Sequence, residues 1–222
     1  MITKQKWCTG LLEVAILAGG EGKRLGNSYK PLLRICGKPI LMNLIEKLEK
    51  LEPSIIIVVH TEEQENMLKV ELEDLKQRTN IRIIRDAINS QASLIGLYTA
   101  LTSSTGDTVI VIPSDTPFLE ASSLLRLKAK IQDFDAAIPI WPSGYIEPLI
   151  AIYRVVPALE AVKESLSKNM LQISSTLKRL RINYVPVDQV FARPEIETFN
   201  INTYEDMERA EKICREKYAI NE

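Results

Sequence analysis

The stretch EVAILAGGEGKRLG, residues 13–26, decides the fold of this chain. Its first part is a nearly continuous apolar run, as expected of a parallel strand that is covered on both faces. Four glycines then follow within eight residues, and such a loop can turn successive N–H groups towards a phosphate while Lys23 and Arg24 neutralise its charge. Ligands bind outside the carboxyl ends of strands in open α/β sheets. The stretch therefore predicts a phosphate-binding loop, with an ordinary glycine-rich turn as the alternative.

Two standard phosphate motifs do not fit this loop. The P-loop needs Lys followed by Ser or Thr after its last glycine, whereas Gly22 is followed by Lys23 and Arg24. The dinucleotide fingerprint needs three glycines at fixed steps at the start of a helix, and the glycines here miss that spacing by one residue. Residues 27–31 also oppose a helix, because the residue before a proline disfavours helical geometry.

The rest of the chain alternates between strand and helix patterns. Further strands are predicted at residues 54–60, 81–85, 108–112, 136–140, 148–153 and 182–187. Apolar stripes predict helices at 40–51 and 67–75. Further helices are predicted near 122–131, from Pro157 onward, and at 170–180. The last helix is predicted from the N-cap Thr203 to about 217. This alternation indicates an α/β fold with a mostly parallel central sheet and right-handed crossovers.

Composition narrows the class of protein. The 222 residues include 28 basic and 29 acidic side chains, and this balance disfavours general nucleic-acid binding. No apolar run approaches the length of a membrane span or a signal peptide, so no membrane association is expected. Cys8, Cys36 and Cys214 are odd in number and far apart, which favours free thiols in a reducing compartment, with the cytoplasm as the expected location. The single histidine, His60, excludes His clusters.

One domain is expected for residues 1–222, because no repeat or Pro/Gly linker divides the chain. Residues 1–12 form an N-terminal extension to which no role is assigned. Within this domain we distinguish two halves, at about 13–118 and about 119–222.

Seven short motifs carry a family resemblance. They are LAGG (17–20), RLG (24–26), KPL (30–32), GKP (37–39), PSDTPFL (113–119), EPLIAIY (147–153) and FNINT (199–203). In this order the motifs resemble the molybdenum cofactor guanylyltransferase family, the MobA-like nucleotidyltransferases, over nearly the whole chain. The resemblance implies a single-domain, three-layer, Rossmann-like nucleotidyltransferase. In it, the nucleotide-binding half is about 13–118 and the acceptor-binding half about 119–222. It also implies transfer of GMP from GTP to the phosphate of molybdopterin, with Mg²⁺ and release of pyrophosphate.

The resemblance also implies roles for individual residues. Catalysis is assigned to Arg24, Lys30 and Asp115, and Asp115 is also the metal ligand. Acceptor binding is assigned to Asn200, Asn202 and Lys168. Nucleotide binding is assigned to Leu17, Ala18, Gly19, Gly20, Gly22, Arg24, Lys30, His60, Asp86 and Gly96.

Physical arguments accompany several of these roles, and each has a plainer alternative. A glycine at position 20 lets the backbone approach a purine, and the Asp86 carboxylate suits the two donors on the guanine edge. A carboxylate such as Asp115 after a buried strand suits Mg²⁺, although it also suits a turn before Pro117. His60 is as well explained as a surface histidine, and Gly96 as a helix-packing glycine. For Asn200 and Asn202, the alternative to acceptor binding is capping of the last helix.

The chain departs from the family at two places. Ala92-Ser93-Leu94 stands where the family has Gly-Pro-Leu, and no arginine stands near Lys168, which is its only substitute there. Two other functions stay open: an adenosylcobinamide-phosphate guanylyltransferase of cobamide synthesis, and a catalytically silent nucleotide-binding module. Transient contact with a cofactor-biosynthesis or acceptor protein is expected, because an oxygen-sensitive cofactor is seldom released freely.

Overall fold

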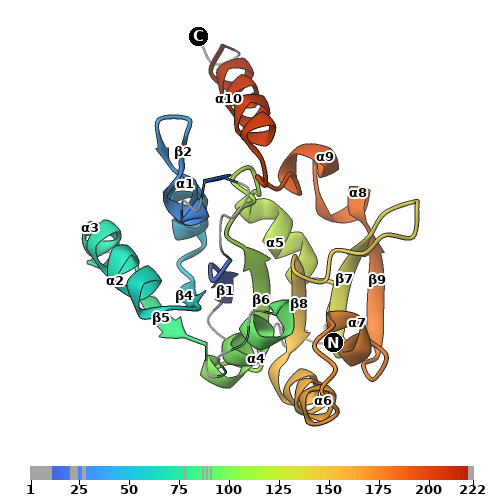
Figure 1. Cartoon of the computed structure of the whole chain (residues 1–222). Helices are drawn as coiled ribbons and strands as arrows, with labels where there is room; N and C mark the ends of the chain where they lie inside the picture. The colour runs from blue at the N-terminus through green and yellow to red at the C-terminus, as the bar shows by residue number, and fades with distance from the viewer. Residues whose placement is uncertain are drawn as a thin grey trace, which may run out of the picture.

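The central sheet of the protein follows the predicted pattern. The computed structural model describes residues 12–20, 25–26, 29–77, 79–86, 88, 90 and 92–219. Within these residues the main sheet has seven strands in the order β5-β4-β1-β6-β8-β7-β9 (Figure 1). The strands are β1 (Glu13–Leu17), β4 (Ser54–Val59), β5 (Ile81–Arg85), β6 (Thr108–Pro113), β7 (Ala136–Ile140), β8 (Ala151–Arg154) and β9 (Ile182–Pro186). Neighbours are parallel except around β8, which is antiparallel to β6 and β7. The mostly parallel sheet is confirmed.

Helices cover both faces of this sheet, because alternate side chains of each strand point to opposite sides. In β4, Ile55 and Ile57 join the cluster beneath one helical layer, whereas Ile56 joins the cluster beneath the other. The first layer contains α1 (Ile40–Leu48), α2 (Glu62–Glu71), α3 (Glu73–Lys76), α5 (Ala121–Lys128) and α8 (Val187–Val190). The second contains α4 (Ser93–Ser103), α6 (Val155–Ser167) and α7 (Ile173–Leu177), with α4 beside α6 in Figure 1. The three-layer architecture is confirmed.

Some predicted boundaries were too generous. The strand expected at 148–153 begins only at Ala151, because the N–H of Ile150 turns back to donate to the carbonyl of Glu147. The helix expected at 170–180 is reduced to α7. Met67, placed in an apolar stripe with Leu68, has 40% of its surface exposed. The two boundary errors share a cause, since an apolar run does not by itself mark where hydrogen bonding begins.

The last helix begins where the sequence predicts. In α10 (Tyr204–Ala219), the Asp206 N–H donates to Thr203 Oγ1 at 3.2 Å, and Thr203 N–H donates to Asp206 Oδ2 at 2.9 Å. This reciprocal pairing satisfies backbone donors of the first turn. The Thr203 cap is therefore confirmed.

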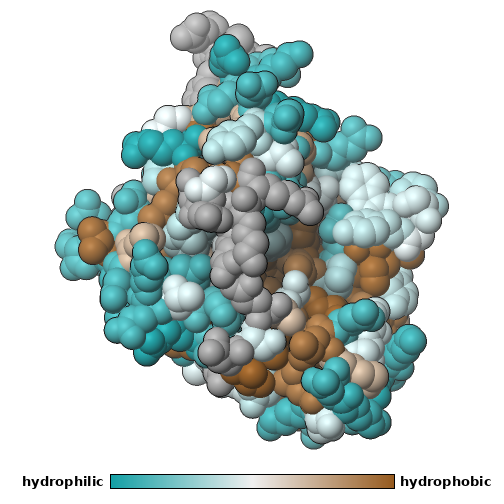
Figure 2. Space-filling view, viewed as in Figure 1, coloured by the Kyte–Doolittle hydropathy of each residue, from teal (hydrophilic) through white to brown (hydrophobic). Residues whose placement is uncertain are grey.

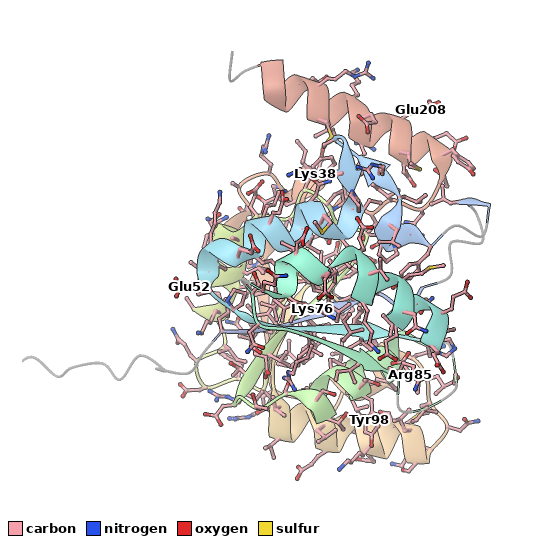
Figure 3. All side chains as sticks on the ribbon, turned by 90° about the vertical axis from the view of Figure 1, so that its left-hand side faces the viewer. Lys38, Glu52, Lys76, Arg85, Tyr98 and Glu208 are labelled. Carbon is pink, nitrogen blue, oxygen red and sulfur yellow. A yellow bond between two sulfur atoms is a disulfide. The ribbon has the colours of Figure 1, made fainter. Side chains whose placement is uncertain are left out.

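A third cluster joins α10 to a small hairpin. The hairpin consists of β2 (Arg34–Ile35) and β3 (Lys38–Pro39), and its Ile35 is fully buried with Ile201 and Ala210. Figure 3 shows this hairpin, marked by Lys38, beneath α10, marked by Glu208. No helix in the described ranges is long and apolar enough to cross a membrane.

A disulfide between Cys36 and Cys214 fastens the hairpin to α10. The expectation of free thiols was wrong for these two residues. They stand 178 residues apart in sequence, and packing of the hairpin on α10 brings their Cα atoms to 5.5 Å, which is within bonding range. Cys8 lies outside the described residues.

Candidate active site

A cavity of about 280 Å³ opens at the carboxyl ends of β1, β4, β5 and β6. After β1, the chain forms β4 and β5 on one side of β1 in the sheet. It then crosses to the opposite side, where β6 pairs with β1. Such a reversal in strand order leaves a crevice, and ligands bind there. A hollow is visible near the centre of the face in Figure 2, with hydrophobic side chains gathered below it.

Most of the predicted site residues meet in this cavity. Those that line it are Leu17, Gly19, Gly20, Lys30, His60, Asp86, Gly96 and Asp115. Gly22, Lys23 and Arg24 lie outside the described residues. Ser93, Ser114 and Leu149 also line the cavity, although the sequence did not single them out. Ser114 follows the end of β6, and this strand-end position was the signal for it, whereas Ser93 begins α4 and Leu149 precedes β8.

The glycine loop is held against the end of β4. A Cβ atom on Gly19 would lie 3.1 Å from the His60 backbone nitrogen, whereas a Cβ on Gly20 would meet nothing within 4 Å. The absence of a side chain at Gly19 therefore lets the loop pack closely on β4. Gly20 borders open space in the cavity, and its approach to a purine stays a prediction. A Cβ on Gly96 would meet Leu17 only at 3.5 Å, in ordinary contact.

Two side chains that the sequence did not indicate fix this loop. The Tyr29 hydroxyl donates to the Ala18 carbonyl at 2.9 Å, and burial raises the pKa of Tyr29, so the hydroxyl stays a donor at neutral pH. Buried Gln64 accepts from the His60 N–H at 2.8 Å through Oε1 and donates through Nε2 to the Gly19 carbonyl at 3.5 Å. Ala18 itself is buried, with its N–H bonded to the Val58 carbonyl.

One end of the cavity carries charge. Lys30 Nζ donates to Asp115 Oδ2 at 3.0 Å and to Asn202 Oδ1 at 2.7 Å. The side chains of Lys30 and Asp115 are 16% and 19% exposed. Asn202 is placed by the last helix, because its N–H donates to Asp206 Oδ2 at 2.9 Å. We call Lys30, Asp115 and Asn202 the charged end.

The charged end has unused bonding capacity. Within the described part of the chain, Lys30 uses two of its three N–H donors, and Asp115 Oδ1 accepts no hydrogen bond. A divalent cation such as Mg²⁺ takes one or two protein carboxylates and fills its other positions with water and phosphate. The described residues contain no group of three or more His, Cys, Asp or Glu side chains that could hold a metal. Asp115 thus fits a metal that is shared with substrate phosphates.

The other end of the cavity carries a buried carboxylate. Asp86 follows β5, and its N–H donates to the Val59 carbonyl at 2.8 Å. Its Oδ1 accepts from Thr99 Oγ1 at 3.0 Å, and its Oδ2 lies 3.4 Å from His60 Nδ1. Burial raises the pKa of Asp86, against the opposing effect of these two contacts. We call His60, Asp86 and Thr99 the base end.

None of the three acceptor residues predicted from the sequence lines the cavity, although Asn202 bonds to Lys30, which does. The Asn200 side chain donates to the Thr198 carbonyl at 3.2 Å. Lys168 follows α6, is 54% exposed and pairs with Glu164 at 2.5 Å. Arg179 pairs with the same Glu164 at 3.0 Å. No arginine stands near position 168 in sequence, but folding brings Arg179 close to Lys168.

Comparisons with known proteins show the family to which the chain belongs. The family described as "MobA-like NTP transferase domain" matches residues 14–181. A Methanosarcina mazei protein named "Probable molybdenum cofactor guanylyltransferase" is 31% identical over 92% of both chains. A Methanosarcina acetivorans protein of the same name is 32% identical over 87% of both.

Solved structures share the fold. The crystal structure of "Molybdopterin-guanine dinucleotide biosynthesis protein A" from Archaeoglobus fulgidus has a TM-score of 0.76 and 30% identity, and the match covers 92% of this chain and 100% of that chain. A nucleotidyl transferase from Methanothermobacter matches with a TM-score of 0.66 and 17% identity, over 93% of this chain and 99% of that chain. This likeness supports the fold alone. The chain belongs to the family of MobA-like NTP transferases.

Proposed function

We propose that this protein is a guanylyltransferase that transfers GMP from GTP to the phosphate of molybdopterin and releases pyrophosphate. The observation that carries the proposal is the cavity itself, which places a buried carboxylate at one end and a Lys-Asp-Asn cluster at the other. The names of the relatives support the choice of nucleotide and acceptor.

The base end supports guanine as the base. An ionised carboxylate accepts hydrogen bonds only, and guanine presents a ring N–H and an exocyclic amine side by side. Adenine presents no such pair of donors, so Asp86 favours guanine. The roles of Gly20 and Gly96 in nucleotide binding, and of the undescribed Gly22 and Arg24, belong to this proposal.

The charged end supports phosphoryl transfer. Two polyanions must approach each other, so fixed positive charge and in-line geometry supply most of the catalysis. Among the described residues, Asp115 and Asn202 hold Lys30 in position and leave one of its N–H donors for a phosphate oxygen. Mg²⁺ held by Asp115 would neutralise charge on the triphosphate. Lys168, Asn200 and Asn202 are proposed to face the acceptor.

The decisive experiment measures pyrophosphate release by the purified full chain. GTP, ATP and CTP are each supplied with molybdopterin or with adenosylcobinamide phosphate, with and without Mg²⁺. We expect release only with GTP, molybdopterin and Mg²⁺ together. Turnover only with the corrinoid would replace the proposed acceptor, and failure with both acceptors would favour the silent nucleotide-binding module.

The cytoplasmic location and the transient protein contact stay predictions. The Cys36–Cys214 disulfide removes the cysteine argument for a reducing compartment. Separation of cell fractions followed by detection of the protein would test the location.

A further inference from the structure

Thr99 is a buried polar residue behind the cavity that the proposed function leaves without a role. It lies on α4 with 1% of its surface exposed, and it is not among the residues that line the cavity. Its hydroxyl donates to Asp86 Oδ1 at 3.0 Å. Thr99 therefore contacts the base-reading carboxylate without contacting the base.

The Asp86 carboxylate is held from two elements. Thr99 on α4 binds Oδ1, whereas His60 at the end of β4 approaches Oδ2 at the longer distance of 3.4 Å. His60 is the titratable group that faces Asp86 in the described part of the chain. Arg85, the residue before Asp86, turns instead to Glu62 and Glu65 on α2, at 2.9 and 3.1 Å (Figure 3). Among the described residues, Thr99 thus makes the shorter of the two side-chain hydrogen bonds to Asp86.

The orientation of this carboxylate matters for base selection. A base with two adjacent donors requires two acceptor lone pairs that face it together. A protonated carboxyl group would replace one acceptor with a donor and reject such a base. A donor behind the carboxylate stabilises the ionised form, and burial opposes it.

We propose that Thr99 is a positioning residue for base selection, whose hydroxyl holds the Asp86 carboxylate as a double acceptor facing a purine with a ring N–H and an exocyclic amine. The inference rests on the proposed function and adds a residue that sets its nucleotide specificity. Thr99→Val removes the donor and nearly preserves the shape of the side chain. Thr99→Ser keeps the donor.

The test compares binding of GTP and of ITP, which lacks the exocyclic amine, by calorimetric titration of the full chain without acceptor. In Thr99→Val we expect the preference for GTP over ITP to fall about tenfold, in the range of one hydrogen bond to a charged group. Affinity for ITP should change less. In the same variant, GTP affinity should begin to decline at a higher pH, because the ionised Asp86 carboxylate has lost a hydrogen-bond donor. Thr99→Ser should retain the wild-type preference and pH profile.

Thr102→Val is the matched control. Thr102 lies on the same helix and is exposed, and its hydroxyl bonds to the helix carbonyls of Tyr98 and Thr99. The control should bind both nucleotides as the wild type does, and the thermal melting temperature of each variant reports its folding.

Three outcomes count against the inference, and they are distinguishable. Wild-type affinities for both GTP and ITP in Thr99→Val overturn the role of Thr99 and leave the proposed function intact. An equal fall in affinity for both nucleotides, with no change in pH profile, assigns Thr99 a structural role. A wild-type protein with no preference for GTP overturns both the guanine assignment and the inference.

Discussion

The two ends of the cavity are built in different ways. At the base end, Asp86 is 26 residues from His60 and 13 from Thr99, and the three come from consecutive elements of one parallel β-α-β unit and the following helix. At the charged end, Lys30 meets Asp115 from 85 residues away and Asn202 from 172 residues away. The base end follows from local strand order, whereas the charged end depends on docking of the last helix.

The two ends also differ in how deeply their side chains are buried. The Asp86 and His60 side chains are 9% and 11% exposed, against 16% and 19% for Lys30 and Asp115. A buried neutral donor such as Thr99 fixes the base end, whereas opposite charges hold the other end together. We therefore expect substitutions at the charged end to reduce turnover, and changes at the base end to alter nucleotide preference.

The largest effect is expected from Asp115→Asn. It removes one carboxylate charge from the charged end while keeping the size of the side chain. We expect kcat to fall about 10²- to 10³-fold, the range seen when one charge-stabilising group is lost. Pyrophosphate release at saturating GTP measures the effect. Asp107→Asn, at an exposed position, is the control and should keep normal turnover. Normal turnover in Asp115→Asn would refute the metal assignment.

Removal of the disulfide should come next. The Cys36→Ser, Cys214→Ser double variant frees the hairpin from α10, and closure of a long loop is worth about 2–4 kcal/mol of unfolding free energy. Denaturant unfolding measures the loss. The hairpin contains no residue of the base end, and it packs on α10, which holds Asn202 at the charged end. GTP affinity should therefore change less than kcat. An equal change in both would contradict the separation of the two ends.

Asn202→Ala tests the link between α10 and Lys30. The variant removes a 2.7 Å bond to a charged donor, a bond of about 1.5–3 kcal/mol. We expect kcat to fall about 10- to 100-fold. Asn183→Ala is a matched control, since the Asn183 side chain bonds to the Lys130 carbonyl away from the cavity. Equal kcat values in the two variants would remove Asn202 from the charged end.

The smallest effect concerns pH. Burial raises the pKa of Asp86, so protonation as the pH falls should begin above the ordinary aspartate value of about 3.9. The carboxyl then loses an acceptor, and affinity for GTP should fall relative to affinity for ATP. The ratio cancels the shared titration of the triphosphates. Asp86→Asn should abolish this pH dependence, and a ratio that is flat with pH in the wild type would contradict it.

Much of the fold followed from local patterns. Apolar runs placed β1, β4, β5 and β6, and Thr203 marked the start of α10. Boundaries failed where a turn used apolar residues, as before Ala151. Of the candidate site, the strand-end residues Asp86 and Asp115 were predictable, because the carboxyl ends of parallel strands meet at one edge of a sheet.

The sequence by itself determined the alternation of strand and helix, the place of the glycine loop and the set of polar residues that could serve a nucleotide. Tertiary structure alone decided which atoms meet: the Lys30–Asn202 bond, the Thr99–Asp86 bond and the Cys36–Cys214 disulfide. Side-chain periodicity is a local property of the chain. Contacts across 172 or 178 residues form only when α10 and the hairpin pack together, and no local pattern encodes that packing.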